Sequence, residues 1–135
     1  MPNSEYVTLE IELRDHLITE DTDAGERIYP DILPQKPTYP AITYQQILNS
    51  SHHDIDIDFP RYQITAWHPR RIDAMNLADQ IDRALTRYKG ALGTIPVKQI
   101  VKEPSPGVLF DRDAGADGAY YVPQDFKIIY VRQKG

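Results

Sequence analysis

The chain has 135 residues, no cysteine and a formal net charge of -5. This length suits one domain and is sufficient to bury a hydrophobic core without disulfides or a structural metal. The absence of cysteine excludes a disulfide framework, a thiolate metal site and a cysteine nucleophile. The acidic balance argues against a dominant nucleic-acid-binding surface, because such surfaces need clustered Lys and Arg.

Neither a signal peptide nor a membrane span is indicated. The N-terminal segment Met1-Pro2-Asn3-Ser4-Glu5 lacks basic and hydrophobic regions, and the longest apolar runs are only a few residues. No linker, repeat or low-complexity tract divides the chain. We therefore expect one domain over residues 1–135, made and kept soluble in the cytoplasm, with no membrane partner.

Residues 4–18 support two periods. Tyr6, Leu9, Leu13 and Leu17 recur at helical spacing, whereas Val7, Leu9, Ile11 and Leu13 alternate as in a strand. The length of the segment, a capping residue at Asn3 or Ser4 and Glu5 in the first turn favour a helix. An acidic loop over residues 20–25 then ends it.

Residues 25–45 are the most distinctive segment, with four prolines between positions 30 and 40. Proline fixes φ, removes a backbone donor and biases the residue before it to extended backbone. The segment is therefore expected to be a stiff, extended arm that leads from the first helix into a sheet. Neither a helix nor a central strand fits between the prolines.

A hairpin and a second helix follow the arm. Residues 41–48 and 61–67 are rich in β-branched and aromatic side chains and flank a polar tip over residues 49–54. Pro69 suits the first turn of a helix over residues 70–88. Its apolar stripe would consist of Ala74, Leu77, Ala78, Ile81, Leu85 and Tyr88, opposite Asp73, Asp79, Asp82 and Arg83. Gly90 and Gly93 are expected to end it.

The last third of the chain predicts strands over residues 97–103 and 126–132, with a proline-rich break at 104–107. A turn-rich loop at 111–118 lies between two further β-like pieces. The predicted fold is α+β, a mostly antiparallel sheet with two amphipathic helices packed on one face. Phe126, Ile128 and Tyr130 would point to one face of the closing strand, and Ile129 and Val131 to the other. That second face, shared with Trp67 and Ile47, either packs on another subunit or lies within a fully covered sheet.

Two segments have features of cation sites. His52-His53-Asp54, with Asp56 and Asp58, combines imidazoles and carboxylates at short spacing, as zinc or a harder cation would require. A solvated hairpin tip explains the same residues and is the favoured interpretation.

Residues 113–118 begin like a calcium loop. Gly115, however, supplies no side-chain ligand, and Gln124 stands where a bidentate Glu is needed. A glycine-rich hairpin loop is the better interpretation.

Catalytic motifs are missing from the sequence. No serine lies in a Gly-x-Ser-x-Gly elbow, and no phosphate-binding glycine loop precedes a helix. His16 and His68 are expected to be packing or surface residues. The cations on the second helix are Arg70, Arg71, Arg83, Arg87 and Lys89; they alternate with acids and indicate a solvated face, or else a patch for an acidic partner or DNA. We therefore expect no enzyme activity, no cofactor and no bound metal.

The order of segments resembles that of the tail-completion proteins of long-tailed bacteriophages, also called tail-to-head joining or tail-terminator proteins. The resemblance covers residues 9–131 and rests on the conjunction of its parts. They are the leading helix, Gly25-Glu26-Arg27-Ile28-Tyr29-Pro30, Pro34-Gln35, Tyr39-Pro40-Ala41-Ile42-Thr43-Tyr44, Tyr62-Gln63-Ile64-Thr65-Ala66-Trp67, the Ala-rich helix over 74–85 and Gln124-Asp125-Phe126-Lys127-Ile128. The acidic residues 20–23 depart from the family pattern.

This resemblance implies a structural role in the virion, at the head-proximal end of the tail, after assembly in the host bacterial cytoplasm. Subunits would form a homo-oligomeric, hexameric ring that caps the tail tube, stops its polymerisation and joins it to the head. The major tail tube protein and a head-tail connector or neck protein would be partners, and DNA would pass through the lumen without specific binding. A neck adaptor on the head side and, more remotely, a small metal-binding enzyme are the alternatives.

Long polar loops on a sheet commonly mediate binding, so the partner contacts are expected in the tip over residues 49–58, the loop over residues 104–118 and the second sheet face. The expected contact residues are Ser50, His52, His53, Asp54, Asp56, Trp67, Asp111, Asp113, Asp117 and Ile129.

Overall fold

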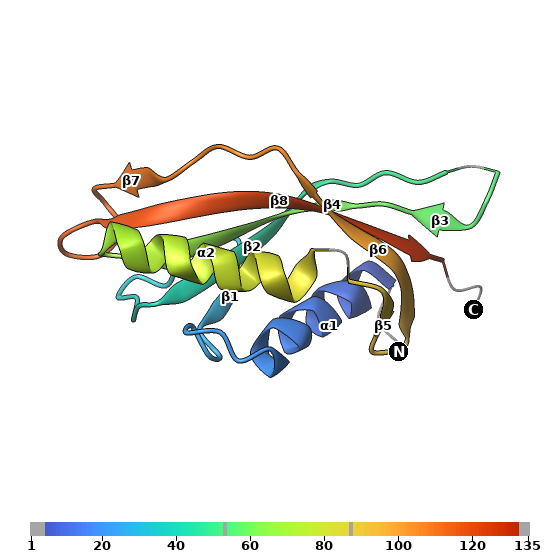
Figure 1. The fold of residues 1–135 in the computed structure, drawn as a ribbon, viewed down its shortest axis with the longest axis horizontal. Helices are drawn as coiled ribbons and strands as arrows, with labels where there is room; N and C mark the ends of the chain where they lie inside the picture. The colour runs from blue at the N-terminus through green and yellow to red at the C-terminus, as the bar shows by residue number, and fades with distance from the viewer. Residues whose placement is uncertain (1–4, 53, 87, 133–135) are drawn as a thin grey trace.

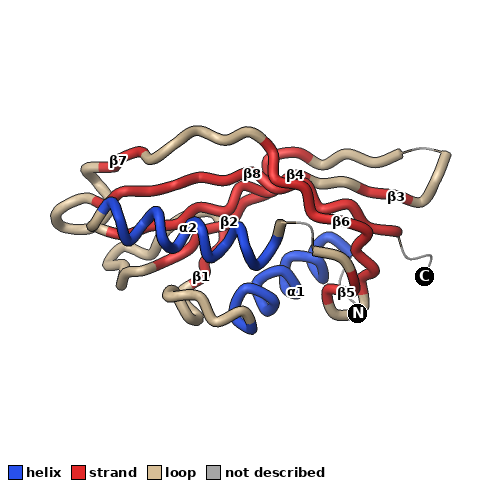
Figure 2. The backbone as a smooth tube through the Cα atoms, in the orientation of Figure 1, coloured by secondary structure: helices blue, strands red, loops and turns tan. Residues whose placement is uncertain are grey.

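Two helices and a curled sheet of eight strands make up the computed structural model, which describes residues 5–52, 54–86 and 88–132 (Figure 1, Figure 2). The helices are α1 (Glu5–Thr19) and α2 (Arg71–Leu85). The strands are β1 (Ile28–Pro30), β2 (Ala41–Leu48), β3 (Ile57–Asp58), β4 (Arg61–His68), β5 (Gly90–Leu92), β6 (Ile95–Glu103), β7 (Leu109–Asp111) and β8 (Ala119–Val131). The predicted α+β class and mostly antiparallel sheet are confirmed.

Strand β8 organises the sheet, whose order is β1-β2-β4-β8-β6-β5. One edge of β8 pairs with β4 and then, at its C-terminal end, with β3. Its other edge pairs with β6 over residues 125–130 and with β7 over residues 119–121. β1 and β2 are parallel, and the remaining described pairs are antiparallel. The predicted hairpin is therefore present as β2 and β4.

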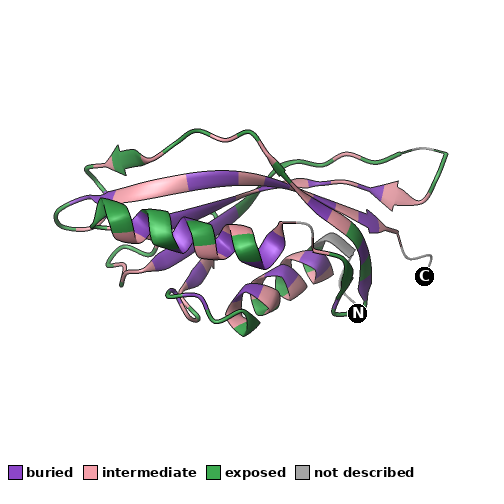
Figure 3. Cartoon of the chain, viewed as in Figure 1, coloured by how far each residue is buried: buried purple, intermediate pink, exposed green. Residues whose placement is uncertain are grey.

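Both helices cover the same face of the sheet, as predicted (Figure 1, Figure 3). Leu9, Leu13 and Leu17 of α1 are fully buried, so the helical period describes the packing of this segment. The predicted stripe of α2 is buried from Ala74 to Leu85. Apart from Ala74, these residues form one cluster with inward side chains of the sheet, namely Ile42, Tyr44, Tyr62, Ile64, Ala66, Val97, Ile100, Phe126, Ile128 and Tyr130.

The arm is fastened within its own subunit. Its first residues form the short edge strand β1, beside β2. The Arg27 guanidinium donates to the backbone oxygens of Pro40, at 2.8 Å, and Asp23, at 3.1 Å. Asp31 turns the chain away from the sheet with φ of 66°. The arm leads from α1 into the sheet as predicted, but it is not extended throughout. Because β1 and β2 are parallel neighbours, with Ile28 opposite Ile42, the chain between them folds back through bends at residues 31–32, 35–36 and 39–40. The prolines did not indicate the edge strand β1.

Two predicted boundaries are wrong, and two short strands were not predicted. α2 ends at Leu85, because Thr86 is extended, with φ of -62° and ψ of 128°, so Gly90 and Gly93 belong to the β5–β6 hairpin instead. β3 and β5 fell inside segments read as loops. β8 begins at Ala119 and runs through Pro123, seven residues earlier than predicted.

Pro123 is tolerated in this central strand for a structural reason. The Asp125 N–H points away from β4, to the Ser105 side chain, so by the two-residue period of a strand the backbone nitrogen of Pro123 points the same way. At Pro123 that edge has no paired strand among the described residues, because β6 ends opposite Asp125 and β7 pairs only with residues 119–121. The missing N–H therefore costs no ladder hydrogen bond.

Candidate assembly surfaces

The predicted contact residues lie in three separate regions of the molecule. Ile129 lies on the second face of the sheet. Ser50, His52, Asp54 and Asp56 belong to the tip next to β3. The aspartates of the 111–118 loop lie next to β7, and Trp67, on β4, lies at the same end of β8. The tip and the loop flank opposite ends of β8 (Figure 1). A strand of this length spans about 40 Å, so one subunit presents two well-separated ends. His53 lies outside the described residues.

Backbone hydrogen bonds and one arginine fix the tip. His52 N donates to Ile57 O at 2.9 Å, and Phe59 N donates to Ser50 O at 2.8 Å. The Arg132 guanidinium donates to the backbone oxygens of His52 and Ile55, both at 3.1 Å. The tip therefore has a defined shape although most of its side chains are exposed.

The aspartates of the tip do not converge as a cation site would require. Asp58 is buried, with 2% of its surface exposed, and accepts a hydrogen bond from the Tyr130 hydroxyl at 3.1 Å. Arg132 lies 3.5 Å from Asp58 and 3.8 Å from Asp56, so a guanidinium occupies the place that a metal would need. Among the described residues, no group of three or more His, Asp or Glu side chains is arranged to hold a metal ion.

An aromatic cluster marks the opposite end. The Trp67 ring stacks on Tyr121, with 4.7 Å between the ring centroids, and its N–H donates to Thr43 Oγ1 at 2.9 Å. Phe110 meets Tyr120 edge-on at 4.9 Å. Since Phe110 and Leu109 remain exposed, apolar surface is available here.

Residues 112–118 form the loop of the β7–β8 hairpin, as the glycine-rich interpretation predicted. Asp111 Oδ1 accepts from the Asp113 N–H at 2.9 Å, a bond that closes a turn at the start of the loop. Gly118 has φ of +79°. The aspartates thus shape the hairpin, and Asp117 lies on its exposed side. A cavity of about 360 Å³ separates this loop from the arm and is walled by Trp67.

The second sheet face, opposite the helices, carries Ile129, which is half-buried. The middle of this face is polar, not apolar as expected: Asp125 accepts from Gln63 at 3.3 Å and lies 3.7 Å from Arg61, and Lys127 lies 3.4 Å from Glu103. Trp67 lies toward one end of the face, as predicted. β8 is therefore central in the sheet without being covered on both faces.

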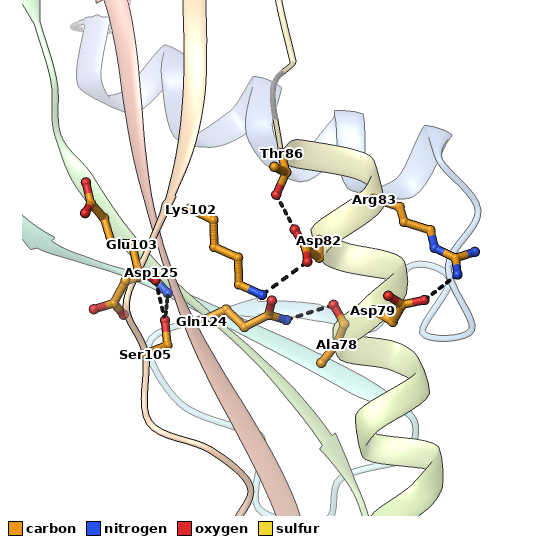
Figure 4. Close-up of polar contacts among 10 residues, drawn as sticks. All are labelled: Ala78, Asp79, Asp82, Arg83, Thr86, Lys102, Glu103, Ser105, Gln124 and Asp125. Atoms are coloured by element: carbon orange, nitrogen blue, oxygen red, sulfur yellow. Dashed lines mark hydrogen bonds and ion pairs between the residues drawn. The ribbon is translucent and has the colours of Figure 1, made fainter.

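Sequence reasoning missed a groove beside the 104–108 connection. The groove has a volume of about 460 Å³ and lies between α2 and this connection. Gln124, with 3% of its surface exposed, donates to Ala78 O at 2.8 Å, and Ser105 Oγ accepts from Asp125 N at 2.9 Å (Figure 4). In the sequence, the signal for this groove was Ser105, a serine between two prolines.

Asp82 forms the polar wall of this groove. Lys102 Nζ donates to it at 3.1 Å, and the Thr86 hydroxyl also donates to it (Figure 4). Partial burial raises the pKa of Asp82, but the hydrogen bonds from Thr86 and Lys102 and the Lys102 charge outweigh it, so its pKa lies below the usual value. The Asp82 carboxylate is therefore charged at neutral pH, and it links α2 to β6 through Lys102.

The histidines and the cations of α2 have local partners. His16 Nε2 lies 3.0 Å from Ala84 O, and His68 Nδ1 accepts from the Arg70 N–H at 2.9 Å. Arg83 pairs with Asp79 at 2.8 Å and is exposed, as a solvated helix face predicts. These contacts describe packing and surface roles.

Comparison with known proteins gives a likeness of fold. No protein family matches the chain, and no curated protein matches it. A chain in the solved structure described as "Virion of native gene transfer agent (GTA) particle" has the same fold, with a TM-score of 0.65 and 12% sequence identity. The match covers 92% of this chain and 95% of that chain, so almost the whole fold is shared with one virion component. No helix in the described part of the chain is long and apolar enough to cross a membrane.

Proposed function

We propose that this protein is a structural component of a phage-like virion, and that within the virion it acts as a tail terminator. The observation that carries the proposal is the fold, which matches a virion component over nearly the full length of both chains. The order of segments along the sequence, which resembles tail-completion proteins, gives the finer assignment. The role requires no bound cofactor and no catalysis.

The arrangement of surfaces suits such a role. A terminator must contact the tail tube on one side and a head-tail connector or neck protein on the other. Here the tip and the β7–β8 hairpin flank opposite ends of β8, so two partners could bind without competing. The half-exposed second sheet face, including Ile129, remains for contact between copies in a hexameric ring.

Loss of the gene tests this proposal. In the genetic element that encodes the chain, electron microscopy of lysates lacking it should show overlong tail tubes and unattached heads, and expression in trans should restore normal particles. Tails of normal length that fail to join heads would instead indicate the neck adaptor. Normal tails on intact heads would refute both roles.

Point variants test the division of labour between the two ends. Replacing His52 and Asp54 together by alanine changes exposed side chains and should leave the fold intact. If the tip contacts one partner only, such particles should show either overlong tubes or unattached heads, but not both. Phe110→Ala should give the other defect. Identical defects from both variants would contradict separate partner surfaces.

A further inference from the structure

The distal half of β2 is an open strand edge. β1 pairs with Ile42, Thr43 and Tyr44 only, whereas β4 continues along β2 to Leu48. Residues 45–48 are all exposed, while residues 41–44 are all buried. This stretch therefore has a strand on one side and no strand partner on the other among the described residues.

The hydrogen-bonding groups of Gln46 face the open side. Ile42 N donates to Arg27 O, and Tyr44 O accepts from Asp31 N, so both point toward β1. Backbone groups alternate along a strand, and the ladder to β4 is regular through Gln46. Gln46 therefore presents its N–H and C=O beyond the end of β1, in line to extend the sheet.

Other edges of the sheet are protected. β1 is short and ends in Pro30, which cannot donate. β6 contains two lysines, Lys98 and Lys102, and its Ile100 N already donates to Tyr88 O at 3.2 Å. β5 and β7 are each three residues long.

The β2 edge has none of these protections. Residues 41–51 contain no charge, no proline and no glycine. Ile47 and Leu48 are 39% and 53% exposed, so apolar side chains border the free backbone groups. An edge of this composition readily accepts another strand.

Acidic groups stand at both ends of this edge. Asp31 and Glu10 lie beside Tyr44: burial and then the nearby Asp31 charge raise the pKa of Glu10. Arg14 is also close, and its guanidinium donates to two backbone oxygens. Two carboxylates and one guanidinium leave this end negative. At the other end are Asp54, Asp56 and Asp58, and Arg132 lies within 4 Å of Asp56 and Asp58, so these four groups together remain negative.

This charge distribution selects the partner. In antiparallel pairing of two copies, the acidic tip of one would approach the acidic end of the other, an unfavourable arrangement of like charges. A strand with an uncharged middle and basic ends would meet favourable charge at both ends.

We propose that the β2 edge at residues 45–48 is a β-augmentation site for an extended segment of a different protein, uncharged in its middle and flanked by Lys or Arg. The added strand would follow on from β1 and hydrogen-bond to Gln46. Ile47 and Leu48 would supply the apolar contacts. This inference does not depend on the proposed function, because it concerns the purified chain.

Binding of a synthetic peptide tests it. The probe is Lys-Thr-Val-Thr-Val-Thr-Lys, and its control is the same peptide with Glu at both ends. Titration with the basic peptide should slow hydrogen exchange of the Gln46 amide at least about fivefold at saturation, since the amide becomes hydrogen-bonded. The acidic peptide should bind at least about tenfold more weakly.

Two variants locate the site. Gln46→Pro removes the outward N–H and leaves the ladder to β4, so the peptide, followed by fluorescence anisotropy, should bind about tenfold more weakly. Ile47→Lys adds a charge to the edge and should also weaken binding, whereas Ile72→Lys, the same change on the exposed face of α2, should not. Circular dichroism confirms that each variant is folded.

Several results would overturn the proposal. They are equal binding of both peptides, unchanged binding to Gln46→Pro and Ile47→Lys, and no slowing at Gln46 with about 1 mM basic peptide, the weak end of specific binding. Protection of Gln46 that grows with protein concentration alone would assign the edge to a second copy instead.

Discussion

The two faces of the sheet are predicted to differ in what they contribute to stability, and adjacent residues of β8 test this. Ile128 has no exposed surface and belongs to the core under the helices, whereas Ile129 lies half-buried on the opposite face. Changing either residue to alanine removes the same atoms from the same central strand. The loss of intrinsic strand preference is therefore similar, and the difference between the variants reports burial.

The magnitudes follow from the number of carbons removed. Isoleucine to alanine deletes three carbons, which at about 0.8 kcal/mol per buried group amounts to roughly 2.4 kcal/mol. At Ile128 a cavity cost is added, so about 3.5 kcal/mol is expected, within the range for buried isoleucine. At Ile129 about half of the transfer cost applies and no closed cavity forms, which gives roughly 1.2 kcal/mol.

Urea unfolding at pH 7, followed by circular dichroism, measures both values. The slope of the free energy of unfolding against urea should be the same in both variants, and about 1–3 kcal/mol/M for a small protein. A gap of about 2 kcal/mol should then separate the midpoints by roughly 1 M. Equal losses would refute the assignment of the faces, as would a larger loss for Ile129→Ala.

Three further predictions concern stability, measured by urea unfolding for the Gly118 and Lys102 variants and by thermal unfolding for the Glu10 variant. Gly118→Ala should destabilise the protein by about 2 kcal/mol or more, because φ is +79° and the added carbon would lie 2.8 Å from a backbone oxygen, whereas Gly107→Ala meets no atom within 4 Å and should be nearly neutral; equal effects would contradict this. Burial and a neighbouring carboxylate raise the pKa of Glu10, so its ionisation opposes folding as the pH rises through that pKa. Glu10→Gln should therefore raise the melting temperature at pH 7 and not below the ordinary pKa of Glu, and a stabilisation independent of pH would argue against the cause given. The pKa of Asp82 is lowered, so its stabilising contribution is present above the ordinary pKa of Asp and is lost as the pH falls through the lowered one. Lys102→Met should cost less than about 1 kcal/mol at neutral pH and nothing at acid pH; a cost that persists in acid would show that the lysine acts through packing.

Sequence patterns predicted those elements whose packing depends on local periodicity. The stripe of α2, the β2–β4 hairpin and the alternation of Phe126, Ile128 and Tyr130 all follow from which side chains face the core. The start of β8 could not be predicted in this way. Pro123 signals a break, and only the gap between β6 and β7 makes it acceptable there.

Local sequence patterns also predicted only part of the placement of the expected contact residues. Trp67 and Ile129 were assigned to the second face from alternation alone, and the structure places them there. The role of Asp58 depends on Tyr130 and Arg132, which are far from it along the chain. The role of Asp111 depends on turn geometry, because its carboxylate accepts from a backbone N–H of the hairpin loop. The polar middle of the second face, between Trp67 and Ile129, depends on cross-strand pairs that no local sequence pattern reveals.

These cross-strand pairs bear on how DNA would pass through a ring of such subunits. In the middle of the second face, Arg61 lies beside Asp125 and Lys127 beside Glu103, so each cation has an acid within 4 Å. Phosphate binding depends on cations whose charge is not already balanced, because it is driven by release of counterions from the nucleic acid. If contact between copies is made around Ile129 and the polar middle of this face lines the lumen, we expect DNA to slide past it without being held. Replacing Glu103 and Asp125 by Gln and Asn would free both cations and should give the purified protein a salt-sensitive affinity for DNA that we expect the natural chain to lack.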